Sequence, residues 1–232
     1  MPSFIALPDL HDKAEVLKRM GRELMHADAV LLAGDMTNGA SHQLLRLFSI
    51  LEEFNEQIYA VNGNMDSHAM LALMAREGIS LHRRHVLCDG VVLAGVGGAL
   101  PFAGKFVFSE AQLASMLDES IAGAPDLPLA LVCHQPPYGT GLDKVGGQHV
   151  GSHAVREFIL RVQPLICFTG HIHEATGIER LGRTTLINPG PAWQSHAYAY
   201  ADIEDGRLKT CEIRPITPES AKPKRTSKDN HD

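Results

Sequence analysis

The strongest constraint on the fold is a repeated unit: a short apolar run ends in a turn, and the next segment has apolar residues at helical spacing. Short apolar runs bounded by turn residues indicate buried strands, and helical spacing indicates amphipathic helices. Strands are predicted at residues 4–7, 30–33, 58–61, 91–96, 129–133 and 165–168. Helices are predicted at 13–25, 43–55, 67–77, 110–121 and 152–161, with Ser41, Ser109 and Ser152 as N-caps. This alternation predicts a layered α/β fold.

The last part of the chain has a different pattern. After Thr176, short alternating stretches are separated by turns at 181–183 and 205–206, which indicates antiparallel hairpins that close a sheet. From Pro215 the sequence is polar and proline-bearing, with no large apolar residue after Ile216. We therefore predict one domain over residues 1–214 and a disordered tail at 215–232.

Composition and charge exclude several classes of protein. The 232 residues are 44% hydrophobic and 21% charged, as in an ordinary globular domain. A net charge of -6 argues against binding to duplex nucleic acid or to an anionic membrane. The sequence has neither a basic leader with an apolar segment nor a stretch near the roughly 18 apolar residues of a membrane span, so we expect a cytoplasmic protein. The four cysteines are widely spaced, which predicts buried thiols.

Polar side chains that can bind a metal follow the predicted strands, at the point where each strand ends. They are Asp9 and His11 after the first strand, Asp35 after the second, Asn64 after the third, His134 after 129–133, and His171 and His173 after 165–168. In open α/β sheets the carboxyl ends of the strands form the ligand-binding edge. We therefore expect these side chains to converge on one crevice.

The donor types indicate which metals would bind there. Imidazole, carboxylate and amide groups suit borderline divalent ions such as manganese, iron, zinc or nickel, and of these we favour manganese. Seven side chains are too many for one ion with an open position, so two ions that share a bridging carboxylate are expected. Gly34, Gly63 and Gly170 each precede a ligand and allow close backbone approach at a crowded site.

Five motifs in order resemble those of calcineurin-like metallophosphoesterases over about residues 4–190. They are DLH at 9–11, GDMTNG from Gly34, GNMD from Gly63, CHQPP around His134 and GHIH from Gly170. The segment LINPG at 186–190 further resembles the small bacterial and archaeal phosphodiesterase branch. The resemblance implies a four-layer α/β/β/α sandwich of two mixed sheets. It also implies one metal on Asp9, His11, Asp35 and His173, and a second on Asp35, Asn64, His134 and His171, with Asp35 as the bridge.

The resemblance further implies hydrolysis of a phosphoester by a hydroxide that bridges the two metals, without a protein nucleophile. A small phosphodiester is the preferred substrate, and an activated phosphomonoester is the alternative. The chain departs from the family at Met65, where many members have a histidine that protonates the leaving oxygen, because a thioether has no proton to donate. His149 is the predicted replacement acid and His68 the second choice, although each also fits an ordinary surface histidine.

The remaining predictions concern substrate contacts and other functions. Asn38, Tyr138 and Trp193 are expected near the substrate, with packing as the alternative for the two aromatic residues. Loss of the acid at Met65 also suits a catalytically weak or inactive metal-binding scaffold of the same fold, although the ligands for both metals are intact. A DNA nuclease would need a capping region and a basic track. A serine/threonine phosphatase would need GDxVDRG and GNHE, where this chain has GDMTNG and GNMD.

Overall fold

Two mixed sheets face each other in the computed structural model, which describes residues 1–217. The first sheet has the order β13 (Arg207–Pro215), β12 (Ala197–Glu204), β1 (Ser3–Leu7), β2 (Ala29–Ala33), β3 (Ile58–Val61). The second has the order β10 (Gly177–Leu181), β11 (Thr184–Asn188), β9 (Ile166–Phe168), β6 (Leu129–Cys133), β5 (Val91–Val96), β4 (Arg84–Cys88). Strands β1, β2 and β3 are parallel, as are β5, β6, β9 and β11, while β4, β10, β12 and β13 pair antiparallel with their neighbours.

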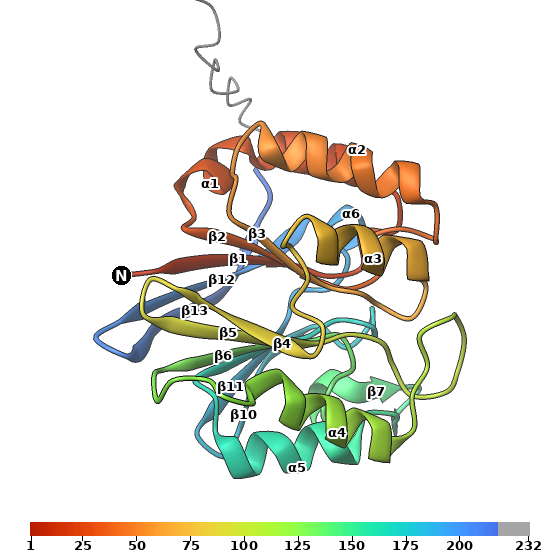
Figure 1. The fold of residues 1–232 in the computed structure, drawn as a ribbon, viewed down its shortest axis with the longest axis vertical. Helices are drawn as coiled ribbons and strands as arrows, with labels where there is room; N and C mark the ends of the chain where they lie inside the picture. The colour runs from red at the N-terminus through yellow and green to blue at the C-terminus, as the bar shows by residue number, and fades with distance from the viewer. Residues whose placement is uncertain (218–232) are drawn as a thin grey trace, which may run out of the picture.

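Helices cover the outer face of each sheet, which gives four layers (Figure 1). On the first sheet lie the 3₁₀ helix η1 (Ala14–Met20), α1 (Gly21–His26), α2 (Ser41–Glu52) and α3 (His68–Arg76). On the second lie α4 (Glu110–Ile121) and α5 (His153–Val162). The shorter elements are η2 (Gly141–Asp143), the hairpin β7 (Lys144–Val145) and β8 (Gln148–His149), and α6 (Ala192–Ser195). The predicted four-layer α/β/β/α sandwich of two mixed sheets is confirmed.

The central strands are apolar throughout because both of their faces are buried. In β1, Phe4 and Ala6 pack between the two sheets, whereas Ile5 and Leu7 pack under the helices of the first layer. This alternation follows from the two-residue period of a strand. At about 25 cal/mol per Å² of buried apolar surface, such strands supply much of the free energy that holds the layers together. The same burial holds the strand ends, and the loops that follow them, in fixed positions.

Most predicted elements are present, and the exceptions have local causes. The predicted helix at 13–25 is divided into η1 and α1, and α1 begins at Gly21, where a Cβ would stand 2.5 Å from the Phe54 ring. The N-cap prediction for Ser41 is wrong, because Ala40 holds that position and Ser41 is the first helical residue. The hydroxyls of Ser109 and Ser152 do accept capping bonds. Strand β4 was not predicted, since Cys88 is its one buried residue and the strand has no continuous apolar run.

The two predicted hairpins are present as the antiparallel pairs β10–β11 and β12–β13. Pro215 ends β13, and the buried Ile216 donates its backbone N–H to the His196 carbonyl, so the folded chain continues to Ile216. From residue 218 onward, the predicted disordered tail lies outside the part of the chain that the structure describes. Cys88, Cys133 and Cys167 are buried free thiols as predicted, whereas Cys211, on the edge strand β13, is only half-buried. None of the helices in residues 1–217 combines the length and apolar composition that crossing a bilayer requires.

Candidate metal centre

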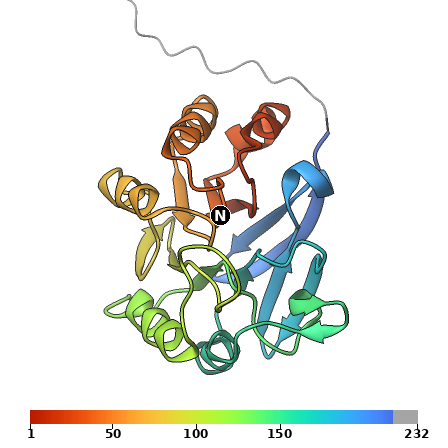
Figure 2. The same cartoon turned by 90° about the vertical axis from the view of Figure 1, so that its right-hand side faces the viewer.

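The seven predicted metal ligands lie in loops at the carboxyl ends of strands from both sheets. Figure 2 is viewed from this side of the molecule. Asp9 and His11 follow β1, Asp35 follows β2 and Asn64 follows β3, all in the first sheet. The second sheet contributes His134 after β6, and His171 and His173 after β9. The site therefore depends on the packing of one sheet against the other.

The loops reach this edge through tight backbone turns. Asp9, His11, Asp35 and His171 all have positive φ, between 44° and 66°. Backbone hydrogen bonds stabilise the turns, from Asp9 N–H to the Gly34 carbonyl at 2.9 Å and from His11 N–H to the Asp35 carbonyl at 3.0 Å. Non-glycine residues in this region carry strain of order 1 kcal/mol or more and are concentrated at functional sites.

The first ligand set consists of Asp9, His11 and His173, whose donor atoms lie within 4.8 Å of one another. The His11 Nε2 atom is 3.3 Å from His173 Nε2, which is 3.5 Å from Asp9 Oδ1. Within residues 1–217, Asp9 Oδ1 is buried and has no hydrogen-bond partner. An unpartnered buried carboxylate oxygen is costly unless a cation binds it. This atom therefore fits a metal ion.

The second ligand set consists of Asp35, His134 and His171, whose donor atoms also lie within 4.8 Å of one another. Asn64 joins this set because its Oδ1 is 3.1 Å from His134 Nε2. The other end of the Asn64 amide, Nδ2, donates to the Ala103 carbonyl at 2.9 Å. That bond turns the amide oxygen, rather than the NH₂ group, toward the second set.

Asp35 lies between the two sets. Its Oδ2 is 3.8 Å from His11 Nε2 and 3.6 Å from His134 Nε2. The other oxygen, Oδ1, accepts a hydrogen bond from the Met65 N–H at 2.8 Å. One carboxylate oxygen thus faces a ring nitrogen of each set, an arrangement that suits a carboxylate shared by two ions.

The histidine rings are oriented for metal binding. His134 Nδ1 is 2.8 Å from the Ala33 carbonyl, which can only accept, so Nδ1 carries a proton and Nε2 faces the site. His11 Nδ1 is 3.0 Å from Asn38 Oδ1, and Asn38 Nδ2 donates to Asp12 Oδ2 at 2.6 Å. A second partner that fixes the distal ring nitrogen is the usual support of a metal-binding histidine. The neutral forms of both rings therefore present Nε2 as a ligand.

The glycines before three of the ligands are required by close packing. A Cβ on Gly63 would stand 2.0 Å from Asp35 Oδ1, and one on Gly34 would stand 2.3 Å from His134 Nδ1. A Cβ on Gly170 would stand 2.6 Å from Asp9 Oδ2. The predicted close approach at these glycines is confirmed, because any side chain there would displace a ligand.

The ligands strongly influence each other's protonation. Burial alone would raise the pKa of the Asp35 carboxyl, but His134, the Met65 N–H and His11 together outweigh burial and lower that pKa. Burial opposes the charge of His134, and Asp35 nevertheless raises the pKa of His134 to about 9. Burial and the neighbouring His134 lower the pKa of His171 to about 4, whereas contact with Asp9 raises the pKa of His173. Opposed shifts among groups this close are typical of functional sites.

Two carboxylates support the ligand loops in roles that the sequence did not indicate. Asp66 is buried and accepts backbone N–H bonds from Gly63 at 2.8 Å, Thr37 at 3.1 Å and Met36 at 3.4 Å, so it joins two of the ligand loops. Burial and nearby Asp35 raise the pKa of Asp66 to about 7. Asp12 holds Asn38, as described above. The motif GNMD contains Asp66, but only the folded loops show what it binds.

The residues predicted to contact substrate have other partners in the structure. Both ends of the Asn38 amide bind protein groups, which makes this residue a support for His11. The Tyr138 ring stacks on His153 with centroids 3.9 Å apart, and the exposed His68 lies against Phe106 at 4.4 Å. Trp193 borders the first ligand set, because its Nε1 donates to the Asp9 carbonyl at 3.1 Å.

His149, the predicted acid, lies on the β7–β8 hairpin, at the lower right of Figure 2. Its Nδ1 is 2.7 Å from Oδ1 of the buried Asp143, and its ring is 5.5 Å from that of Tyr138. Asp143 also accepts backbone N–H bonds from Gly139, Thr140 and Gly151. The contacts of His149 are therefore with its own loop rather than with either ligand set.

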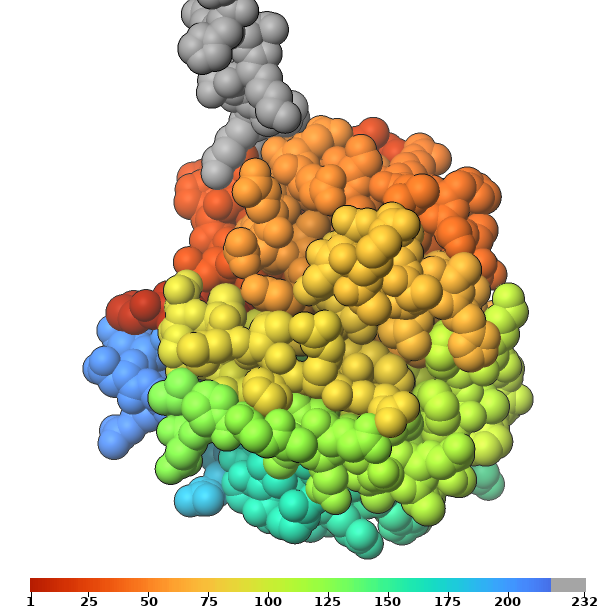
Figure 3. Space-filling view, viewed as in Figure 1, coloured from red at the N-terminus to blue at the C-terminus, as the bar shows by residue number. Residues whose placement is uncertain are grey.

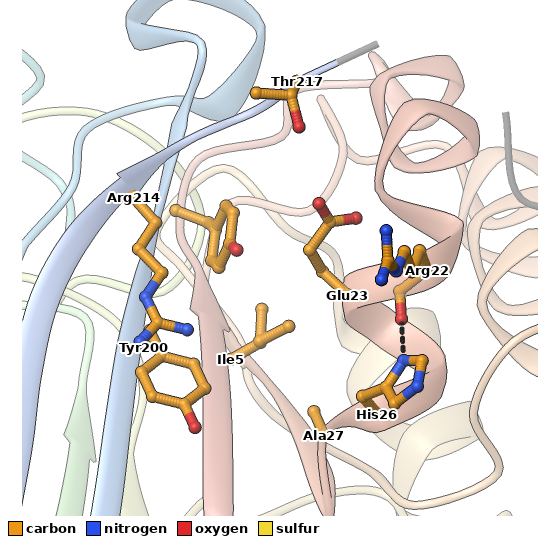
Figure 4. Close-up of a pocket in the computed structure, with 9 residues that line it drawn as sticks. Ile5, Arg22, Glu23, His26, Ala27, Tyr200, Arg214 and Thr217 are labelled. Carbon is orange, nitrogen blue, oxygen red and sulfur yellow. Dashed lines mark hydrogen bonds between the residues drawn. The ribbon is translucent and has the colours of Figure 1, made fainter. Parts of the chain in front are cut away.

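A pocket of about 670 Å³ lies elsewhere, between α1 and strands β12 and β13 (Figure 4). It is lined by Arg22, Glu23, His26, Tyr200 and Arg214 among others, and the Arg214 guanidinium stacks on the Tyr200 ring at 3.4 Å. None of the predicted site residues lines this pocket. The candidate metal ligands lie instead in the loops at the carboxyl ends of the strands.

Proteins of two other organisms have sequences similar to this chain. The chain is 27% identical over 195 residues to an uncharacterized protein of Methanocaldococcus jannaschii, covering 81% of this chain and 87% of that protein. It is 28% identical over 182 residues to a UPF0046 protein of Caenorhabditis elegans, covering 69% of this chain and 61% of that protein.

Solved structures share the fold. A protein of Thermus thermophilus superposes with a TM-score of 0.72 at 23% identity, over 93% of this chain and 99% of that one. A dimetal phosphatase of Danio rerio superposes with a TM-score of 0.62 at 14% identity, over 94% and 99%. Residues 3–206 match the family described as the calcineurin-like phosphoesterase superfamily domain. Since that match spans nearly the whole chain, the protein belongs to the calcineurin-like phosphoesterase superfamily.

Proposed function

We propose that the protein is a metal-dependent phosphodiesterase that hydrolyses a small phosphodiester, or an activated phosphomonoester, with two divalent metal ions. The observation that carries this proposal is Asp35, whose Oδ2 lies between a ring nitrogen of each ligand set. Asp9, His11, Asp35 and His173 would hold one ion, and Asp35, Asn64, His134 and His171 the other. Among manganese, iron, zinc and nickel, we favour manganese for this mixed nitrogen and oxygen set.

The residues present fit such ions, as the unpartnered Asp9 Oδ1 and the inward-facing Nε2 atoms indicate. When bound, two divalent ions supply a hydroxide at neutral pH and neutralise charge on the phosphoryl oxygens. The protein's contribution is to fix the geometry. Asn38 holds the His11 ring, the Ala33 carbonyl holds the His134 ring, and the Ala103 carbonyl turns the Asn64 oxygen inward.

Met65 cannot protonate the leaving group, because its thioether has no proton to donate, so a proton would come from another residue or from solvent. We keep His149 as the proposed acid. Asp143 supports this role, because its buried carboxylate lies 2.7 Å from Nδ1 and fixes the orientation of the imidazole ring. An enzyme without an effective acid would be restricted to esters with low-pKa leaving groups, such as nitrophenolates.

The test is hydrolysis of bis-p-nitrophenyl phosphate and p-nitrophenyl phosphate by metal-stripped protein refilled separately with manganese, iron, zinc or nickel. We expect metal-dependent turnover that is faster on the diester and is lost in His171→Ala. Turnover of equal size in His171→Ala, or in the metal-stripped protein, would contradict the proposal.

A second candidate function, favoured by Met65, is a catalytically weak or inactive metal-binding scaffold of the same fold. The same experiment separates the two candidates if metal content is measured alongside turnover. Two bound metals without turnover on either ester would favour the scaffold.

A further inference from the structure

The loop that joins β5 to α4 contains Ala103, whose carbonyl orients the proposed ligand Asn64, and it also carries the lysine Lys105. Its two ends are tied together, because Ala99 N–H donates to the Phe106 carbonyl at 3.1 Å and Phe108 N–H donates to the Ala99 carbonyl at 2.8 Å. The Phe106 side chain is buried, whereas residues 101–105 are exposed. Figure 1 shows this loop in yellow-green at the right of the molecule, on the side where the strands end.

Backbone hydrogen bonds hold this loop against Asn64. The N–H groups of Lys105 and Phe106 donate to the Asn64 carbonyl at 2.7 and 3.3 Å, and the Ala103 carbonyl accepts from the Asn64 side chain. Gly104 has a φ of +98°, and a Cβ there would stand 2.1 Å from the Asn64 carbonyl oxygen. The position of Lys105 is therefore fixed relative to a proposed metal ligand. In Figure 3 the yellow-green atoms of this region lie against the gold atoms of the segment that follows β3.

The Lys105 side chain extends over two of the ligand loops. The point where a Cβ of Gly39 would stand lies 3.5 Å from Lys105 Nζ and 3.4 Å from the Met65 carbonyl oxygen. Gly39 is four residues after Asp35, and Met65 directly follows Asn64. Within residues 1–217, none of the carboxylates forms an ion pair with Lys105. An exposed ammonium without an acidic partner thus stands beside the proposed metal centre.

We propose that Lys105 is a substrate-binding residue, whose ammonium binds the phosphate group of the phosphoester beside the loops of Gly39 and Met65. The substrate is an anion and the chain has a net charge of -6, so an unpaired ammonium beside the site would add to the attraction that the metal ions exert on the phosphate. A charge-assisted hydrogen bond to phosphate contributes more than a neutral one. This inference rests on the proposed function, which supplies the phosphate ligand.

The test compares four full-length proteins loaded with manganese: wild type, Lys105→Gln, Lys105→Arg and the control Lys209→Gln. Lys209 is exposed on β13, where it pairs with Glu204 close to the β12–β13 turn; this turn is at the left of Figure 1. Its replacement therefore removes one positive charge far from the proposed metal centre. Calorimetry measures the affinity for inorganic phosphate, elemental analysis measures bound metal, and bis-p-nitrophenyl phosphate hydrolysis gives kcat/KM.

We expect Lys105→Gln to bind phosphate about tenfold more weakly, to lose kcat/KM by a similar factor and to retain its metal. The Arg variant should keep most of the affinity, and the Lys209 control should match wild type. Equal phosphate affinity in Lys105→Gln and the control would overturn the Lys105 proposal, even if both proteins hydrolyse the ester. A different result would be that phosphate binding depends on Lys105 while wild type does not hydrolyse the ester. That result would support Lys105 as a phosphate-binding residue and contradict the proposed function.

Discussion

A single oxygen atom, Asp35 Oδ2, connects the two ligand sets, and this makes Asp35 the residue whose replacement is most informative. Asp35→Asn preserves the shape of the side chain and an oxygen for the Met65 N–H, but it removes the negative charge that two cations would share. We expect metal content to fall below two per chain and turnover to fall by about a thousandfold or more. Elemental analysis and the diester assay measure both effects.

The matched control for this variant is Asp126→Asn, an exposed carboxylate in the loop before β6. It should retain wild-type metal content and activity. If Asp35→Asn kept two metals and normal turnover, the dinuclear mechanism would have to be abandoned.

A second residue, His82, should make stability depend on pH. Its Nδ1 accepts the Gly97 N–H at 3.0 Å, and burial, followed by the charge of Arg83, lowers the pKa of His82 from 6.5 to about 4. Between these values the unfolded chain binds a proton that the folded chain does not, so stability rises with pH. The contribution of the neutral ring is complete above pH 6.5 and is lost as the pH falls toward 4. We expect a loss of about 1–3 kcal/mol over that window.

His82→Asn keeps an acceptor for the Gly97 N–H but cannot be protonated in this range. Urea unfolding at about pH 7.5 and about pH 5, on either side of the ordinary histidine pKa, should therefore show a smaller loss of stability in this variant than in wild type. The control, His42→Asn, replaces an exposed histidine on α2 and should follow the wild-type curve. Parallel losses in all three proteins would show that His82 is not responsible.

At this scale the sequence predicted which residues meet but not how they are supported. The motifs placed all seven proposed ligands at the strand ends, where the structure has them, because residue type and position relative to an apolar run can be read directly from the sequence. Asn38 was expected at the substrate, whereas it orients His11, and Asp66 had no assigned role. Such pairings join residues tens of positions apart, and their hydrogen bonds depend on loop conformation that no local pattern encodes.

Among the elements, the loop between β5 and α4 can be tested through Gly104. Gly104→Ala combines backbone strain at φ +98° with a contact of 2.1 Å to the Asn64 carbonyl, so the loop must move away from Asn64. The Asn64 amide would then lose the Ala103 bond that orients it. We expect weaker retention of the second metal ion, measured by competition with a chelator.

Gly90→Ala is the control for backbone strain. Gly90 has a φ of +80°, and a Cβ there meets nothing within 4 Å. Both variants should therefore lose about 1 kcal/mol of stability to strain, but only Gly104→Ala should lose metal. Equal metal retention in the two variants would separate this loop from the metal centre.

Among the secondary-structure elements, buried strands were easier to predict than the type of a helix. Strands β1, β2 and β6 are buried on both faces, and continuous burial produces an unmistakable apolar run. The segment at 14–26 has helical spacing, yet it forms a 3₁₀ helix and a short α-helix because Gly21 packs closely against Phe54. Periodicity reports which face is buried, and it does not distinguish between helix types.

For the whole molecule, the origin of the ligands in both sheets predicts that metal binding stabilises the fold. Asp9, Asp35 and Asn64 come from the first sheet, whereas His134, His171 and His173 come from the second, so bound ions would join the two halves. A ligand that binds only the folded state at about 100 times its Kd adds about 2.7 kcal/mol, which for a chain of this size raises Tm by roughly 5–10 °C.

Removing metal with a chelator should therefore lower Tm by several degrees without unfolding the protein, because the apolar layer between the sheets remains intact. Circular dichroism in the presence and absence of manganese measures both effects. Asp35→Asn should show a much smaller metal-dependent shift, whereas Asp126→Asn should show the full shift. An unchanged Tm in wild type, despite two bound ions, would mean that the ions bind the unfolded chain as tightly as the folded one, and it would contradict this prediction.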